Sequence, residues 1–67
     1  MVRRVKHEIK VEEAFLNYEP LWLERVKRMT GYGRIRAKRL MRELLSKYGG
    51  RKMRIGPCKA ILRFEGD

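Results

Sequence analysis

The chain has 67 residues, of which 18 are Lys or Arg and 8 are Asp or Glu, so its net charge at neutral pH is +10. This length allows one domain, 1–67, near the lower limit for independent folding, and the 43% hydrophobic content argues against a disordered tail. The charge excess predicts a polyanionic partner, with a ribosomal or merely soluble basic protein as the alternative.

The same composition bears on compartment and cofactors. Cys58 is the single cysteine and His7 the single histidine, so a zinc site has no ligand set and we expect a reducing compartment. No apolar run approaches the roughly 18 residues that a membrane span requires. Met1–Val5 lacks the apolar segment of a signal peptide. We therefore expect a cytoplasmic protein without a metal, a cofactor or a membrane contact.

Residues 1–9 are interpreted as a flexible basic arm, although Val5, His7, Ile9 and Val11 alternate as in a strand. From Lys10 the spacing changes to that of a short helix, whose apolar face is predicted to hold Val11, Ala14, Phe15 and Tyr18.

A second helix is predicted from about Pro20 to Met29, because proline suits the first position of a helix. Trp22, Val26 and Met29 share one face of this helix. Trp22 is interpreted as the main hydrophobic anchor of the core, and the alternative is a platform on which a base stacks.

A third helix is predicted from Arg34 to Tyr48, with Gly49-Gly50 as its stop. One arc of this helix is apolar and consists of Ala37, Leu40, Met41, Leu44, Leu45 and Tyr48. The opposite side is basic and carries Lys38, Arg39, Arg42 and Lys47. A solvated surface is the alternative interpretation of that basic side.

After this helix, residues 51–54 form a basic linker and residues 55–57 a turn, and Pro57 is expected to begin a last short helix that buries Ala60, Ile61 and Phe64. Cys58 is expected to be a small, buried or half-buried residue. The predicted fold is therefore all-α, with about four short helices. The alternative is α+β, in which the last segment is a strand that pairs with residues 5–11.

Two glycines one residue apart connect the second and third helices in the stretch Met29-Thr30-Gly31-Tyr32-Gly33-Arg34. The first N–H groups of a helix have no intrahelical partner, and the helix dipole is positive at that end. Such a start binds anions, and several arginines and lysines follow it here. This turn is therefore predicted to hold a nucleic-acid phosphate.

The stretch resembles the helix-hairpin-helix motif, which reads apolar, any residue, Gly, apolar, Gly, three of any kind, Ala, two of any kind, apolar. The matching residues are Met29, Gly31, Gly33, Ala37 and Leu40. Within that superfamily, residues 21–48 look most like the actinobacterial type of integration host factor. The resemblance implies a small helical nucleoid protein that binds DNA through this turn. Tyr32 stands where an aliphatic residue is usual, and it is expected either to pack inward or to face a sugar or base.

The predicted function is a non-enzymatic, largely sequence-independent, nucleoid-associated or architectural DNA-binding protein. The alternatives are an RNA- or ribosome-associated protein and a protein-interaction subunit, and a homodimer or larger complex stays open. No paired acids, metal cluster or nucleophile motif indicates an enzyme. The predicted nucleic-acid contacts are Thr30, Gly31, Tyr32, Gly33, Arg34, Arg36, Lys38, Arg39, Arg42, Arg51, Lys52 and Arg54.

Overall fold

The computed structural model describes residues 5–64, which form three helices and three strands. In chain order the elements are α1 (Lys6–Leu16), β1 (Leu21–Trp22), α2 (Leu23–Thr30), α3 (Arg34–Tyr48), β2 (Arg51–Ile55) and β3 (Cys58–Leu62). Residues 1–4 of the predicted basic arm, which include Arg3 and Arg4, lie outside the described residues.

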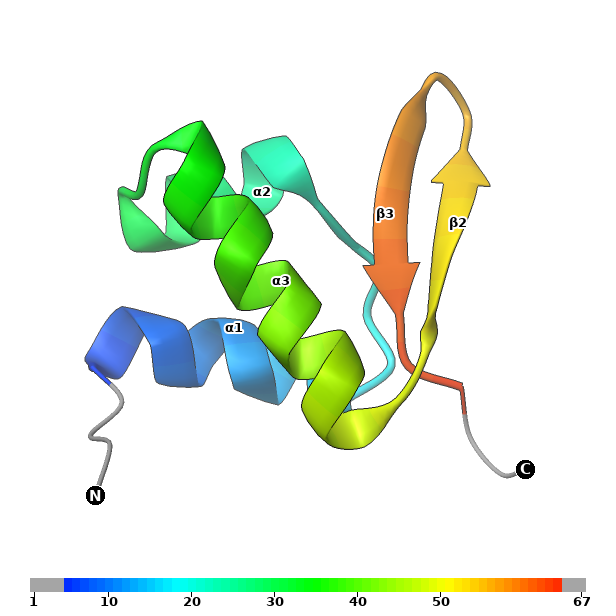
Figure 1. The fold of residues 1–67 in the computed structure, drawn as a ribbon, viewed down its shortest axis with the longest axis horizontal. Helices are drawn as coiled ribbons and strands as arrows, with labels where there is room; N and C mark the ends of the chain where they lie inside the picture. The colour runs from blue at the N-terminus through cyan, green and yellow to red at the C-terminus, as the bar shows by residue number, and fades with distance from the viewer. Residues whose placement is uncertain (1–4, 65–67) are drawn as a thin grey trace.

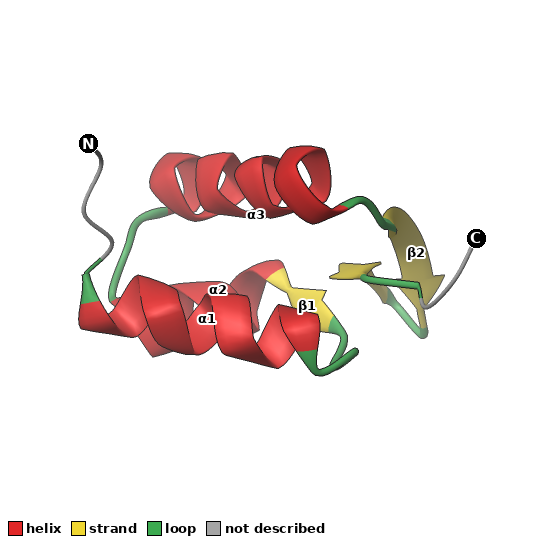
Figure 2. Cartoon of the chain, turned by 90° about the horizontal axis from the view of Figure 1, so that it is seen from below, coloured by secondary structure: helices red, strands yellow, loops and turns green. Residues whose placement is uncertain are grey.

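The helices form two layers, with α3 lying across α1 and α2, and the sheet closes one end of them (Figure 2). The sheet is antiparallel with strand order β1-β3-β2. In Figure 1 the β2–β3 hairpin starts at the C-terminal end of α3 and runs back beside the helix, and the two elements separate toward the tip of the hairpin.

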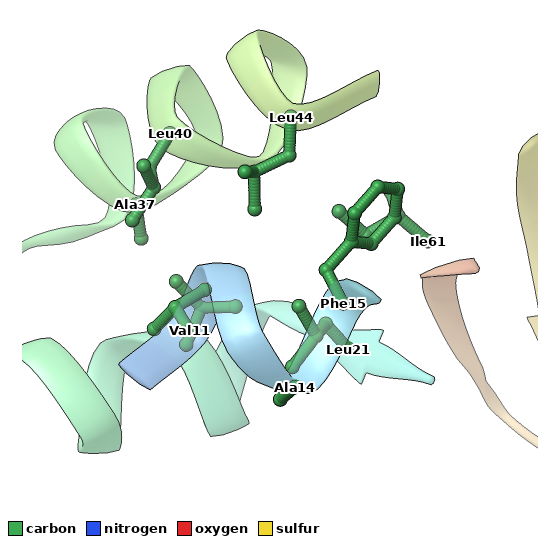
Figure 3. Close-up of a cluster of buried hydrophobic side chains, with 9 residues drawn as sticks. Val11, Ala14, Phe15, Leu21, Ala37, Leu40, Leu44 and Ile61 are labelled. Atoms are coloured by element: carbon green, nitrogen blue, oxygen red, sulfur yellow. The ribbon is translucent and has the colours of Figure 1, made fainter. Parts of the chain in front are cut away.

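The hydrophobic core joins all three helices to the sheet (Figure 3). Phe15 of α1 is fully buried and lies between Leu44 of α3 and Ile61 of β3. Ala37 is also fully buried, at the end of α3 where it packs on the other helices. The apolar arc predicted for residues 34–48 is confirmed, because Ala37, Leu40 and Leu44 are buried and its other members pack at the core's margin.

The all-α prediction is wrong, because the last segment forms a strand instead of a helix. Gly56 occupies the first central position of a two-residue turn with φ of +59°, and Pro57 follows it. A glycine with positive φ at that position is typical of a type II′ hairpin turn. Pro57 therefore lies in a turn, and the mixed α+β alternative has the right class. Its pairing with residues 5–11 is wrong, since β3 pairs with β1 and β2.

Three other assignments differ from the prediction. Residues 6–9 belong to α1, so the flexible arm is wrong for that part of the chain. Trp22 lies in β1 and is 36% exposed, so it is not the core anchor, a role that Phe15 and Leu21 fill instead. Tyr18 follows the end of α1 with φ of +64° and is exposed, so it does not extend the buried face of that helix.

The predicted stop at Gly49-Gly50 is confirmed, since α3 ends at Tyr48 and Gly49 caps it. Gly50 has φ of +144°, and a β-carbon there would lie 2.7 Å from the carbonyl oxygen of Leu62. The absence of a side chain at this point lets the hairpin turn back tightly against the core.

Candidate nucleic-acid interface

A three-residue glycine turn joins α2 to α3, as the sequence predicts. Gly31 caps α2 with φ of +77°, a left-handed conformation that favours glycine. Thr30 is buried, and its hydroxyl donates to the Val26 carbonyl at 2.7 Å and accepts from the Tyr32 N–H at 3.1 Å. Thr30 therefore holds the turn in shape from inside, and a direct contact of its side chain with a nucleic acid is excluded by its burial.

Tyr32 packs inward and ties the turn to α1. Its hydroxyl donates to the Glu8 carboxylate, and the His7 ring meets the tyrosine ring edge-on at 5.2 Å between centroids. The guanidinium of Arg36 lies 4.3 Å from the centroid of the same ring. The aromatic ring of Tyr32 is thus half-buried between two helices, and Arg36 is held at its surface.

The start of α3 is rich in positive charge. Gly33 precedes the helix with φ of −73°, and no side chain within residues 5–64 caps the first turn. That turn contains no acidic residue but does contain Arg34 and Arg36. The free N–H groups and the positive end of the helix dipole therefore face solvent together with two guanidinium groups.

The side of α3 opposite the core forms the outward face, defined here as Ile35, Lys38, Arg39, Arg42 and Ser46. All of these residues are exposed. Ile35 and the fully buried Leu44 are nine residues apart, which at 3.6 residues per turn places them on opposite sides of the helix, about 180° apart. Ile35 is 77% exposed, whereas the other exposed large apolar residues that the structure describes are between 36% and 46% exposed.

The hairpin has two chemically different faces. Side chains alternate along a strand, and Ile61 of β3 points into the core. The register pairs Lys52 with Ile61 and Arg54 with Lys59, so these three cations lie on the same, inner face as Ile61. Arg51, Met53 and Ile55 then lie on the outer face, where the Arg51 guanidinium is 5.3 Å from the Phe64 ring.

A groove of about 450 Å³ separates α3 from β3. Its apolar lining includes Trp22, Leu23, Met41 and Ile61. Among the described residues, four cations line it as well, Lys38 and Arg42 from α3 and Lys52 and Lys59 from the hairpin, against the one carboxylate of Glu24. The inner hairpin face and the outward face of α3 therefore meet along one strongly cationic strip.

Lys47 does not belong to this strip. Its ammonium donates to the Glu12 carboxylate at 3.4 Å, and the Tyr48 hydroxyl donates to the same oxygen at 2.6 Å. Hydrogen bonding to Tyr48 and to Glu12 raises the pKa of Lys47 above its ordinary value of 10.5. The lysine thus links α3 to α1 on the side of the helix away from the hairpin.

Several residues of the predicted site come together, and others do not. Gly33, Arg34, Lys38, Arg39 and Arg42 lie along the exposed side of α3, and Lys52 and Arg54 approach from the hairpin. Gly31 is exposed in the turn beside them. Thr30 is buried, Tyr32 and Arg36 stack on each other, and Arg51 lies on the outer face of the hairpin.

Sequence reasoning missed Ile35 and Lys59. Ile35 falls outside the apolar arc of its helix, and this mismatch was the available signal. Lys59 was assigned to a helix, and only the strand register places it beside Arg54. Cys58, expected to be buried or half-buried, is exposed.

Within residues 5–64, no three His, Cys, Asp or Glu side chains are grouped so that they could bind a metal ion. None of the described helices is long and apolar enough to cross a bilayer.

No family model, curated protein or solved structure matches this chain, so the resemblance to the actinobacterial integration host factor type stays a prediction.

Proposed function

We propose that this protein is a non-enzymatic protein that binds double-stranded DNA, with α3 in the major groove and the β2–β3 hairpin on the adjacent backbone. The observation that carries the proposal is the convergence of cations from two separate elements. Lys38 and Arg42 of α3 and Lys52 and Lys59 of the hairpin line one groove. A chain with a net charge of +10 has cations elsewhere too, but here four of them line one groove in which Glu24 is the one carboxylate among the described lining residues.

The helix–turn–helix arrangement of α2 and α3 supports a specific docking mode. Two helices joined by a three- or four-residue turn containing glycine commonly place the second helix in the major groove. The 15 residues of α3 make a rod about 22 Å long whose core side is buried and whose opposite side is free. Such a rod fits the wide major groove of B-DNA, whereas the major groove of A-form RNA is deep and narrow.

Phosphate contacts would supply most of the affinity. The uncapped start of α3, with Gly33 and Arg34, offers backbone N–H groups and a guanidinium to one phosphate. Lys52, Arg54 and Lys59 on the inner hairpin face offer ammonium and guanidinium groups to phosphates across the groove. Phosphate contacts position a protein without reading sequence, so this part of the affinity is sequence-independent. We therefore also propose a nucleoid-associated or architectural role in the cytoplasm, which sequence-independent binding would suit.

The test is a set of equilibrium titrations with duplex DNA, single-stranded DNA and structured RNA over a range of salt concentrations. We expect duplex DNA to bind most tightly. The slope of the logarithm of the binding constant against the logarithm of the salt concentration should decrease in magnitude by about one unit when Arg39 or Arg42 is replaced with alanine. Lys47→Ala is the matched control, because Lys47 lies on the same helix but is engaged by Glu12. Tighter binding to structured RNA, or equal slopes for all variants, would contradict the proposal.

A second candidate function, association with another protein chain, is favoured by the outer face of the sheet. The register places Met53 opposite Ala60 on this face, with Ile55 next along β2. Met53 and Ile55 are each partly exposed, and Arg51 is the single charged residue that β2 and β3 contribute to this face. A mainly apolar surface on a strongly cationic chain suits a second copy of the same chain.

Sedimentation velocity over a wide range of protein concentration tests this second candidate. We expect a concentration-dependent dimer that Met53→Glu abolishes, while Lys52→Glu, one residue away on the inner face, preserves it. A monomer at every concentration would contradict self-association.

A further inference from the structure

We propose that Ile35 reads thymine through its methyl group, so that α3 adds a sequence preference to the affinity supplied by phosphate contacts. This inference rests on the proposed DNA binding and deepens it by naming a residue that determines specificity. It starts from one exposed apolar side chain among the exposed cations of α3.

Ile35 is not part of the hydrophobic core. It lies opposite Leu44 on α3 and is 77% exposed, far more than any other large apolar side chain among the described residues. Its helical neighbours on the outward face are Arg39 and Arg42, one and two turns further along. The side chain adds nothing to binding a phosphate, and its exposure to water is unfavourable.

The position of Ile35 within the helix indicates what it would contact. When a recognition helix enters the major groove, residues near its N-terminus contact the base edges. Ile35 is the second residue of α3, and the turn before it is held firmly by Thr30 and Tyr32. A stiff, β-branched side chain on a fixed turn presents a defined apolar surface.

The major groove offers one apolar group for such a surface. The base edges there carry hydrogen-bond donors and acceptors, and thymine adds its C5 methyl group. Neither the phosphates nor the other base edges would favour isoleucine over a polar residue. The chemistry of the groove therefore assigns Ile35 to thymine, while Arg39 and Arg42 on the same face remain available for phosphates or guanine.

The experiment first selects preferred duplexes from a random-sequence library with the wild-type protein, with Ile35→Ala and with Ile9→Ala. Ile35 lies outside the core, so Ile35→Ala is expected to fold normally, which circular dichroism verifies. Ile9→Ala is the matched control, since Ile9 is an exposed isoleucine on α1, away from the proposed interface. We expect thymine enrichment at one or two positions with wild type and Ile9→Ala, and its loss with Ile35→Ala.

Replacing single thymines of the selected duplex by deoxyuridine then removes the methyl group alone. At the contacted position we expect about a fourfold loss of affinity for wild type, which corresponds to one buried methyl group, and no further loss for Ile35→Ala. The salt slope should be the same for both proteins, because no charge changes.

The outcomes separate this inference from the proposed function. If duplex DNA binds but thymine is not enriched, or deoxyuridine weakens both proteins equally, the role of Ile35 is overturned and DNA binding stands. If Ile35→Ala instead changes the sedimentation of the protein while the thymine effect persists, Ile35 is a protein contact and the inference is overturned. If no duplex binds at any salt concentration, the proposed function falls and the inference falls with it.

Discussion

The helix–turn–helix and the β-hairpin contribute cations to the same strip, but they are built in different ways. The outward face of α3 lies on a helix whose opposite side is anchored in the core by Ala37, Leu40 and Leu44. Every residue of β2 is exposed, and the hairpin joins the core through Ile61 of β3. One half of the proposed interface is therefore held by several buried side chains, and the other by backbone pairing, a tight glycine connection and the single core residue Ile61.

The largest expected contrast is between a core change and a hairpin change. Phe15→Ala should destabilise the fold by about 3 to 5 kcal/mol, because a fully buried ring leaves a cavity between α1, α3 and β3. That loss approaches the whole stability of a domain of this size. Met53→Ala, on the outer face of the hairpin, should cost less than about 1 kcal/mol. Urea unfolding followed by circular dichroism measures both, and equal losses would contradict the contrast.

A second contrast concerns the two ends of the hairpin. Gly50→Ala should cost about 2 to 3 kcal/mol, since the new β-carbon would meet the Leu62 carbonyl and the backbone angle is unfavourable for alanine. Gly56→Ala at the hairpin tip should cost about 1 kcal/mol, because positive φ is its only difficulty and no atom lies within 4 Å. Thermal unfolding of both variants measures the difference, and a larger loss for Gly56→Ala would mean that the hairpin is anchored elsewhere.

Binding and stability should move in opposite directions at the start of α3. Gly33→Asp should stabilise the fold by about 0.5 kcal/mol, because the aspartate side chain would cap the free N–H groups of the helix. The φ of −73° at Gly33 is one that any residue can adopt. The same carboxylate would occupy the anion site, so affinity for duplex DNA should fall about tenfold, roughly the value of one charge-assisted hydrogen bond. Gly33→Ala serves as the control, with a small loss of stability and little change in charge. Unchanged affinity in Gly33→Asp would remove the start of α3 from the interface.

The hairpin itself offers a matched pair of adjacent cations. Lys52 faces the groove and Arg51 faces outward beside Phe64. Lys52→Ala should reduce the logarithmic salt slope for duplex DNA by about one unit, and Arg51→Ala should leave it nearly unchanged. Equal effects of the two substitutions would show that the two faces of the hairpin do not differ in binding.

The smallest expected effect concerns the link between α3 and α1. Because the pKa of Lys47 is raised in the folded protein by Tyr48 and Glu12, its contribution to stability is fully present below the unfolded pKa near 10.5. It is lost as pH rises through the higher folded pKa. Lys47→Gln should therefore lose less stability than wild type when urea unfolding is compared at about pH 9 and about pH 11.5. A larger alkaline loss in the variant would contradict this sign.

The parts of the fold that could be predicted are those in which apolar residues repeat with a clear period in the sequence. The apolar residues of 34–48 repeat with the period of a helix, and Gly49-Gly50 stops it, so α3 was predicted with its observed bounds. The hairpin carries no such signal, because all of β2 is exposed and the short spacing of Ala60, Ile61 and Phe64 fits a helix or a strand. A proline can lie at the start of a helix or in a turn. Pro57 lies in a turn, because the preceding Gly56 has a positive φ that a hairpin turn requires.

The candidate site was predictable to the same extent. The glycine turn and the cations of α3 followed from sequence, since both lie within one continuous motif. The partnership between α3 and the hairpin depends on tertiary placement, so Lys59 and the division of residues 51–54 between two faces were not predictable. The inward packing of Tyr32 was left open because it depends on Glu8 and His7, more than 20 residues earlier.

The most direct test of the central claim is an amide chemical-shift map of the isotope-labelled protein titrated with a DNA duplex. The proposed surface predicts that the largest changes lie in residues 33–42 and, together with them, at Lys52, Arg54 and Lys59. It also predicts small changes in the middle of α1 and at Arg51. Changes confined to the helices would leave the hairpin out of the interface, and changes centred on α1 or on the outer face of the sheet would contradict the claim that α3 and the hairpin form one DNA-binding surface.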